Sequence, residues 1–134
     1  MAGNGTSSRP TVLVVDDEIG PREAFKLVLE DQFNVLTADG GHAALKTLAE
    51  HPVDVITLDL MMPSLSGVET LRKIRAVDSD VEVVVVSAMP ASELVSECTE
   101  LRAFDILAKP FSRAEILSAA DRAARRRIAK RHPA

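Results

Sequence analysis

Short apolar runs rich in β-branched residues recur five times along the chain, and each is followed by a segment with helical spacing of its apolar residues. The central runs are nearly continuous rather than alternating, which is typical of parallel strands covered on both faces. Repeated strand–helix units predict an α/β fold: a doubly wound five-stranded parallel sheet with strand order 2-1-3-4-5 and five helices. The expected strands are 12–15, 35–37, 53–58, 83–86 and 104–108.

Local signals predict where several of the helices begin. Ser66 with Glu69 and Ser112 with Glu115 each form the Ser-x-x-Glu pattern of a capping box. Pro21 suits the first position of the first helix, because the N–H that proline lacks would have no partner there.

The length and composition favour one globular domain. The chain has 134 residues, of which 46% are hydrophobic and 27% charged, too apolar for a disordered segment. We predict a flexible lead-in at residues 1–10, one domain at 11–128, and a basic tail or the start of a linker at 129–134. No apolar run approaches the roughly 20 residues that a membrane span needs, so no membrane association is expected.

Charge and cysteine content indicate the cellular compartment and exclude some kinds of partner. The single cysteine, Cys98, excludes an internal disulfide and is typical of the reducing cytoplasm. A formal charge of −4 argues against a chain whose whole surface binds nucleic acid. A basic run near the C-terminus is interpreted first as a solvated helix end, with a linker or a patch for nucleic acid or an acidic partner as alternatives. It consists of Arg122, Arg125, Arg126, Arg127, Lys130 and Arg131.

Chemically capable side chains follow four of the expected strands. Asp16 and Asp17 end the first strand, Asp59 the third, Ser87 the fourth and Lys109 the fifth. In doubly wound sheets, ligands bind outside the carboxyl ends of the strands, where the strand order reverses. Three converging carboxylates repel one another unless one is protonated or a cation is bound, and an oxygen-only, accessible cluster suits Mg²⁺. A carboxylate in such a site can act as a nucleophile toward a phosphoryl group.

These residues belong to a longer pattern, which consists of Asp16-Asp17, Leu58-Asp59-Leu60-Met61-Met62-Pro63, Gly67, Ser87-Ala88 and Lys109-Pro110-Phe111. With this pattern, the sequence resembles the receiver domain of two-component response regulators over about residues 10–128. The resemblance implies a flavodoxin-like fold. It further implies that Asp59 is the phosphoacceptor, and that Lys109 and Ser87 contact the phosphoryl group. Mg²⁺ would be held by Asp16 through water, by Asp17 and Asp59 directly, and by the backbone carbonyl of Met61. A cis peptide bond before Pro110 is also implied.

The same resemblance implies the partners. The phosphoryl group would come from a histidine kinase or a histidine phosphotransfer protein. The output would pass to a further domain or a partner through the face formed by the fourth helix, fifth strand and fifth helix, which commonly makes homodimers in the family. Nucleic acid would be reached only through an output domain. The chain would be a signalling switch that catalyses only its own phosphoryl transfer and dephosphorylation, either as a single-domain regulator or as the receiver of a longer protein.

Two positions depart from the family pattern. The switch position that usually carries Tyr or Phe is Ile106, and the residue that is usually Gly before the fifth strand is Arg102. Phe104 is expected on the same strand face as Ile106, about 6–7 Å along the strand, and so is no obvious substitute. We therefore expect activation to move Ser87 and reshape the following loop with little rotation at Ile106.

Three other functions compete with this interpretation. A flavodoxin-like cofactor binder needs a phosphate loop rich in glycine and hydroxyl groups after the first strand, where Asp16-Asp17-Glu18 would repel phosphate unless a metal intervened. A pseudo-receiver would dock partners without phosphorylation, but the intact acidic set argues against it. A phosphohydrolase with an aspartate nucleophile, of the dehalogenase-like type, needs a second Asp two residues after the nucleophile. That position is Met61, which cannot transfer a proton.

Overall fold

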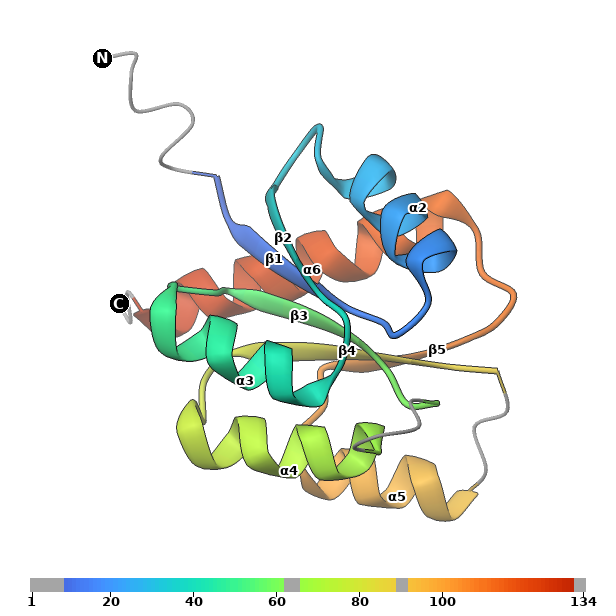
Figure 1. Cartoon of the computed structure of the whole chain (residues 1–134). Coiled ribbons are helices and arrows are strands. Elements are labelled where there is room, and N and C mark those ends of the chain that lie inside the picture. The colour runs from blue at the N-terminus through green and yellow to red at the C-terminus, as the bar shows by residue number, and fades with distance from the viewer. Residues whose placement is uncertain (1–8, 62–65, 89–91, 132–134) are drawn as a thin grey trace.

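The computed structural model describes residues 9–61, 66–88 and 92–131. Residues 1–8 of the lead-in predicted at 1–10, and residues 132–134 of the tail predicted at 129–134, lie outside them. Within the described residues, five strands and five helices alternate along the chain (Figure 1). They are β1 (Thr11–Val15), α2 (Ile19–Leu29), β2 (Asn34–Ala38), α3 (Gly41–Glu50), β3 (Val55–Asp59), α4 (Gly67–Val77), β4 (Glu82–Ser87), α5 (Ser92–Glu100), β5 (Asp105–Ala108) and α6 (Arg113–Arg131).

The predicted sheet is confirmed. All strands pair in parallel, in the order β2-β1-β3-β4-β5. Helices α2 and α6 cover one face, and α3, α4 and α5 cover the other (Figure 1). Because every strand runs the same way, the carboxyl ends of β1, β3, β4 and β5 meet at one edge, on the right of Figure 1.

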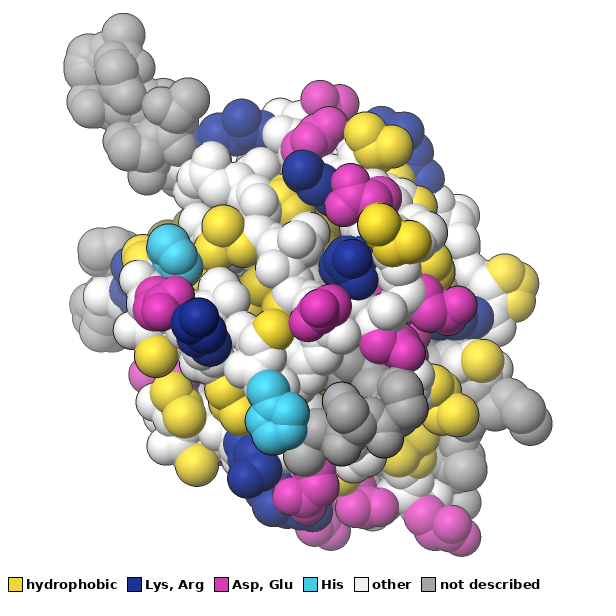
Figure 2. Space-filling model, in the orientation of Figure 1, with side chains coloured by type: hydrophobic (Ala, Val, Ile, Leu, Met, Phe, Trp, Pro, Cys, Tyr) yellow, Lys and Arg dark blue, Asp and Glu magenta, His cyan; other side chains and the backbone are white. Residues whose placement is uncertain are grey.

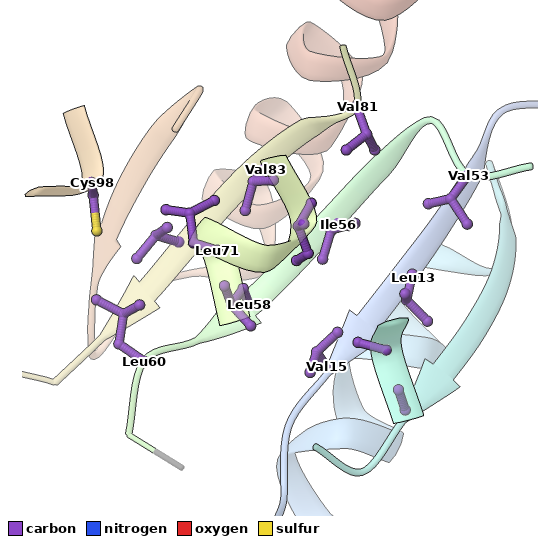
Figure 3. Close-up of a cluster of buried hydrophobic side chains, with 14 residues drawn as sticks. Leu13, Val15, Val53, Ile56, Leu58, Leu60, Leu71, Val81, Val83 and Cys98 are labelled. Atoms are coloured by element: carbon purple, nitrogen blue, oxygen red, sulfur yellow. The ribbon is translucent and has the colours of Figure 1, made fainter. Parts of the chain in front are cut away.

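The core has two halves, one on each face of the sheet. Alternate residues of a strand enter different halves: Ile56 and Leu58 of β3 pack toward α3–α5, whereas Val55 packs toward α2 and α6. Figure 3 shows the first half, where Leu71 of α4 and Cys98 of α5 meet strand residues. Each fully buried Leu or Ile side chain contributes about 1.5–3 kcal/mol, and such side chains come from both the strands and the helices that cover them.

Both predicted capping boxes are present as helix caps. The Ser66 hydroxyl accepts the Glu69 N–H at 3.2 Å, and the Ser112 hydroxyl accepts the Glu115 N–H at 3.1 Å. At Ser112 the box is reciprocal, because its own N–H donates to the Glu115 carboxylate at 2.9 Å. The prediction for Pro21 was wrong by two positions: α2 begins at Ile19, directly after an Asx turn in which the Asp16 carboxylate accepts the Glu18 N–H. Pro21 still lies in the first turn, where its missing N–H has no intrahelical partner.

The basic run of α6 is largely paired with acidic residues at the amino ends of β3 and β4. Arg126 and Lys130 lie 3.2 and 2.6 Å from Oε2 of Glu82. Arg131 and Arg127 lie 2.8 and 3.9 Å from Oδ1 of Asp54. These pairs attach the C-terminal half of the helix to the sheet, so the run is more than a solvated helix end.

One buried arginine closes the same end of the sheet. Arg75 lies at the end of α4, and its guanidinium donates to the carbonyls of Leu101 and Arg102, each at 2.8 Å, and also to the carbonyl of Val81. These bonds join the loop before β4 to the loop before β5. Arg102 itself has φ 60°, the left-handed conformation that glycine adopts most readily.

The turn at Arg102 redirects Phe104. The ring was expected on the face of Ile106, but it packs in the α2/α6 half of the core, with the Arg122 guanidinium 5.7 Å from its centroid. The expectation was wrong because Phe104 precedes β5, where strand alternation does not yet apply. Ile106 packs toward α3–α5, so no ring shares its position.

Surface character is mixed. On the face shown in Figure 2, hydrophobic side chains are scattered among acidic and basic ones. Among the helices of the described residues, none combines the length and apolar character that crossing a bilayer requires.

Candidate functional site

Backbone pairing carries the predicted site residues to one edge of the sheet. Just past β1, the Asp16 N–H donates to the Ala38 carbonyl at 3.1 Å. Asp59 is opposite Val86 in the β3–β4 register, and Ser87 is opposite Ala108 in the β4–β5 register. The Lys109 N–H then donates to the Ser87 carbonyl at 2.9 Å. Four neighbouring strands therefore present Asp16, Asp59, Ser87 and Lys109 side by side.

Asp59 is the centre of this arrangement. Its side chain is 5% exposed, with Oδ2 3.1 Å from the Lys109 ammonium. Oδ1 accepts the N–H of Met61 at 2.9 Å, which fixes the carboxylate against its own loop. A buried carboxylate is thus held in one orientation by one cation and one backbone donor.

Asp16 is the second buried carboxylate. Burial raises its pKa, the Glu18 N–H bond lowers it, and the nearby Asp59 charge raises it further, for a net upward shift. The carbonyl of Asp16 accepts a bond from the Arg22 guanidinium at 2.9 Å, which anchors the β1–α2 turn. Arg22 was missed by sequence analysis, because a lone arginine in an exposed helical pattern gives no signal of a backbone contact.

An oxygen-rich cluster lies beside Asp59. Carboxylate oxygens of Asp16, Asp17 and Glu18 all lie within 4.8 Å of one another, with Asp16 buried and the other two exposed. Asp59 is not a member of that group, and its Oδ2 lies 3.1 Å from the Lys109 ammonium. The donor set is oxygen only and accessible, so these residues fit a hard divalent cation such as Mg²⁺.

The remaining predicted residues surround this centre. Ser87 is fully buried at the end of β4, and Met61 is 68% exposed on the β3–α4 loop. Ile106 lies in β5 on the face of α3–α5. The Lys109–Pro110 bond is cis, as the resemblance implied. Met62, Pro63 and the loop after Ala88 lie outside the described residues.

Sequence patterns did not predict a role for Thr57, a buried polar residue of β3 near Asp59. Thr57 is buried two residues before Asp59, and its hydroxyl has no hydrogen-bond partner among the described residues. It lines a cavity of about 10 Å³ with Asp16, Asp59 and Phe25, the last of which packs edge-on against Phe111 at 5.4 Å. Threonine is a common strand residue, so its presence did not indicate that its hydroxyl would lack a partner among the described residues.

Comparison with known proteins agrees with this geometry. The sequence model of the response regulator receiver domain matches residues 12–121. The chain is 34% identical over 116 residues to the chemotaxis protein CheY of Listeria monocytogenes, covering 85% of this chain and 98% of that protein. It is 41% identical over 101 residues to a cyclic di-GMP phosphodiesterase of Thermotoga maritima, covering 75% of this chain but only 27% of that protein.

A solved structure agrees as well. The crystal structure of a response regulator receiver protein from Pseudomonas putida has a TM-score of 0.81 and 31% identity, and the match covers 86% of this chain and 98% of that one. Receiver domains are signalling switches of two-component systems that generally bind Mg²⁺ at an acidic pocket. The fold, the converging strand ends and these matches together place the chain in the response regulator receiver domain family.

Proposed function

We propose that Asp59 accepts a phosphoryl group from a histidine kinase or a histidine phosphotransfer protein. In this step the Asp59 carboxylate forms an O–P bond while the N–P bond of a phosphohistidine breaks, and the imidazole nitrogen keeps the electron pair. The buried Asp59 carboxylate, oriented by Lys109 at 3.1 Å and by the Met61 N–H, is the observation that carries the proposal. Phosphoryl transfer requires mainly positioning and charge neutralisation, which this arrangement supplies.

The acidic residues would hold Mg²⁺. Asp17, Asp59 and the Met61 carbonyl are the proposed direct ligands, with Asp16 acting through water. When bound, Mg²⁺ supplies positive charge that offsets the phosphoryl oxygens and the carboxylates. Lys109 supplies a second positive charge, and the Ser87 hydroxyl donates a hydrogen bond to a phosphoryl oxygen.

The modified site would bias a two-state equilibrium of the domain. Ser87 moves toward the phosphoryl group, the loop after Ala88 changes, and Ile106 rotates little. The proposed output surface is the α5–β5–α6 face, acting on an output domain, a partner or a second copy of the chain. We place this switch in the cytoplasm, with residues 11–128 as the switching unit and no enzymatic activity beyond its own phosphorylation and dephosphorylation. Nucleic acid would be contacted only by an output domain.

Intact-mass measurement after incubation with acetyl phosphate and Mg²⁺ tests the proposal. The expected result is a gain of one phosphoryl group, absent with EDTA and absent in Asp59→Asn. Asp39→Asn, at an exposed position after β2, is the matched control and keeps the adduct. An unmodified wild-type chain would favour the pseudo-receiver, and an adduct that persists in Asp59→Asn would exclude Asp59 as the acceptor.

A further inference from the structure

A second charged site lies at the amino ends of β4 and β5, the opposite end of the sheet from Asp59. A cavity of about 470 Å³ is formed there by the end of α4, the loops before β4 and β5, and the C-terminal half of α6. We call it the amino-end pocket. Its charged lining consists of Arg75, Arg102, Arg126, Lys130, Asp80 and Glu82, and its apolar wall is formed by Ala103 and Phe104.

Part of this charge is already neutralised. Glu82 is almost completely buried and forms ion pairs with Arg126 and Lys130 at 3.2 and 2.6 Å. Arg75 donates to main-chain carbonyls, which satisfy its N–H groups but carry no charge to cancel its own. The carboxylate of Asp80 opposes an incoming anion. The four cations of the lining outnumber its two carboxylates, and Arg75 and Arg102 are the two of these cations that form no ion pair among the described residues.

Arg102 differs from Arg75 in that its guanidinium lacks hydrogen bonds as well as a counterion within the described part of the chain. Its guanidinium has no ion pair or hydrogen bond among the described residues, and the side chain is exposed. It lies near enough to Arg75 that its charge adds to the effect of burial in lowering the pKa of Arg75. An anion between the two guanidinium groups would turn this repulsion into two attractions.

The backbone of Arg102 ends helix α5. Its φ of 60° is the left-handed conformation of the C′ position of a Schellman motif, in which the Arg102 N–H donates to the Thr99 carbonyl at 2.9 Å and the Ala103 N–H donates to the Cys98 carbonyl at 3.0 Å. Glycine is usual at this position, so the turn itself does not require a guanidinium there.

We propose that the amino-end pocket binds a small molecule carrying phosphate groups, with Arg102 as its principal contact. The planar guanidinium fork matches two phosphate oxygens at once. The cavity volume falls in the range of about 300–1,000 Å³ that is usual for small-molecule sites, larger than a single phosphate requires. The site is separate from Asp59, so the proposal holds whether or not Asp59 is phosphorylated.

Isothermal titration calorimetry on the full chain without Mg²⁺ tests the proposal, with inorganic pyrophosphate, adenosine 5′-diphosphate and adenosine as probes. The chain has no Trp or Tyr, so amide NMR shifts rather than fluorescence locate the binding site. We expect saturable binding of both diphosphates, weaker binding of adenosine, and shifts centred on residues 79–82 and 101–104. Tighter binding of adenosine 5′-diphosphate than of pyrophosphate would identify a nucleotide, and equal binding would identify the phosphates alone as the recognised group.

Variants make the test specific. Arg102→Asn removes the guanidinium but keeps a residue that tolerates positive φ, and we expect it to weaken binding by about tenfold or more. Arg102→Lys retains the charge and is expected to lose less. Arg72→Asn removes an exposed arginine of α4 outside the pocket and should change affinity by less than about twofold. Three outcomes would each overturn the proposal. They are no saturable binding up to millimolar concentration, equal weakening of binding by Arg102→Asn and Arg72→Asn, and amide shifts centred on residues 16–18.

Discussion

Lys109 Nζ lies 3.1 Å from Oδ2 of Asp59, although the two residues are 50 positions apart in the chain. The Asp59 side chain is 5% exposed and that of Lys109 is 32% exposed. Lys109 is therefore the cation that offsets the charge of a nearly buried carboxylate.

Replacing Lys109 by Met should lower the free energy of unfolding by about 1–3 kcal/mol, because the Asp59 charge stays buried without its cation. The loss stays below that of a fully buried pair, since Lys109 is partly solvated. Urea denaturation measures it, and the exposed Lys73→Met on α4 is the matched control, expected within about 0.5 kcal/mol of wild type. Adding Asp59→Asn to Lys109→Met should restore most of the loss, and a double variant no more stable than Lys109→Met would contradict this account.

Gly67→Ala should destabilise the domain by about 2 kcal/mol or more, because overpacking against backbone has no easy relief. A Cβ at Gly67 would lie 2.3 Å from Cα of Leu60, the residue after Asp59. Gly20 in α2 is the control, since a Cβ there meets nothing within 4 Å. Gly20→Ala is expected to raise stability by about 0.5–1 kcal/mol through helix propensity alone. Thermal unfolding of the two variants should therefore shift in opposite directions.

Arg102→Gly should raise the free energy of unfolding by about 1 kcal/mol, because glycine relieves the positive φ of 60°. Arg102→Ala also removes the guanidinium and its repulsion of Arg75, but keeps a Cβ. The difference between the two variants in urea denaturation isolates the backbone effect. Equal stabilities would mean that the turn carries no strain.

Thr57→Val should raise stability by about 1 kcal/mol, because it replaces an unpartnered buried hydroxyl by a methyl group of similar size. Thr47→Val is the contrasting change, since the Thr47 hydroxyl donates to the Ala43 carbonyl at 3.0 Å. Calorimetric melting should show a gain for the first variant and none for the second. A loss of stability in Thr57→Val would indicate that its hydroxyl has a partner such as a bound water.

The buried thiol of Cys98 should make the free energy of unfolding depend on pH in the alkaline range. Burial, with a smaller effect of Glu97, raises the pKa of its thiol above the usual 9.0. Below pH 9.0 the thiol is protonated in both states and its contribution to stability is constant. Above that pH the unfolded thiol ionises while the folded one does not, so stability falls by at most about 1.4 kcal/mol per pH unit.

The check for Cys98 is urea denaturation on both sides of pH 9.0, with Cys98→Val as the reference that lacks the titrating group. As the pH rises, the free energy of unfolding of the wild type should fall relative to that of Cys98→Val. A difference that stays constant across this range would show that the folded thiol ionises as readily as the unfolded one.

The fold was predictable because its causes are local. Apolar β-branched runs specify buried parallel strands, and the Ser66 and Ser112 capping boxes fix helix starts. The convergence of Asp16, Asp59, Ser87 and Lys109 followed from strand order alone. Arg75 could not be foreseen, because its guanidinium bonds both to a carbonyl of the loop that follows its own helix and to carbonyls of the loop before β5, 26 residues away, and no sequence spacing encodes that meeting. Phe104 was misplaced for a similar reason, since the left-handed turn at Arg102 interrupts the alternation used to place it.

The ion pairs of Arg127 and Arg131 with Asp54 hold the end of α6 at the amino edge of the sheet. Asp59 lies at the other edge, a strand of five residues or about 17 Å away. Salt at physiological ionic strength, with a Debye length of about 8 Å, screens the half-exposed Arg131, but it screens a nearly buried charge on Asp59 much less. The packing of α6 against the sheet and the field of such a charge would therefore both connect Asp59 with the far end of the helix.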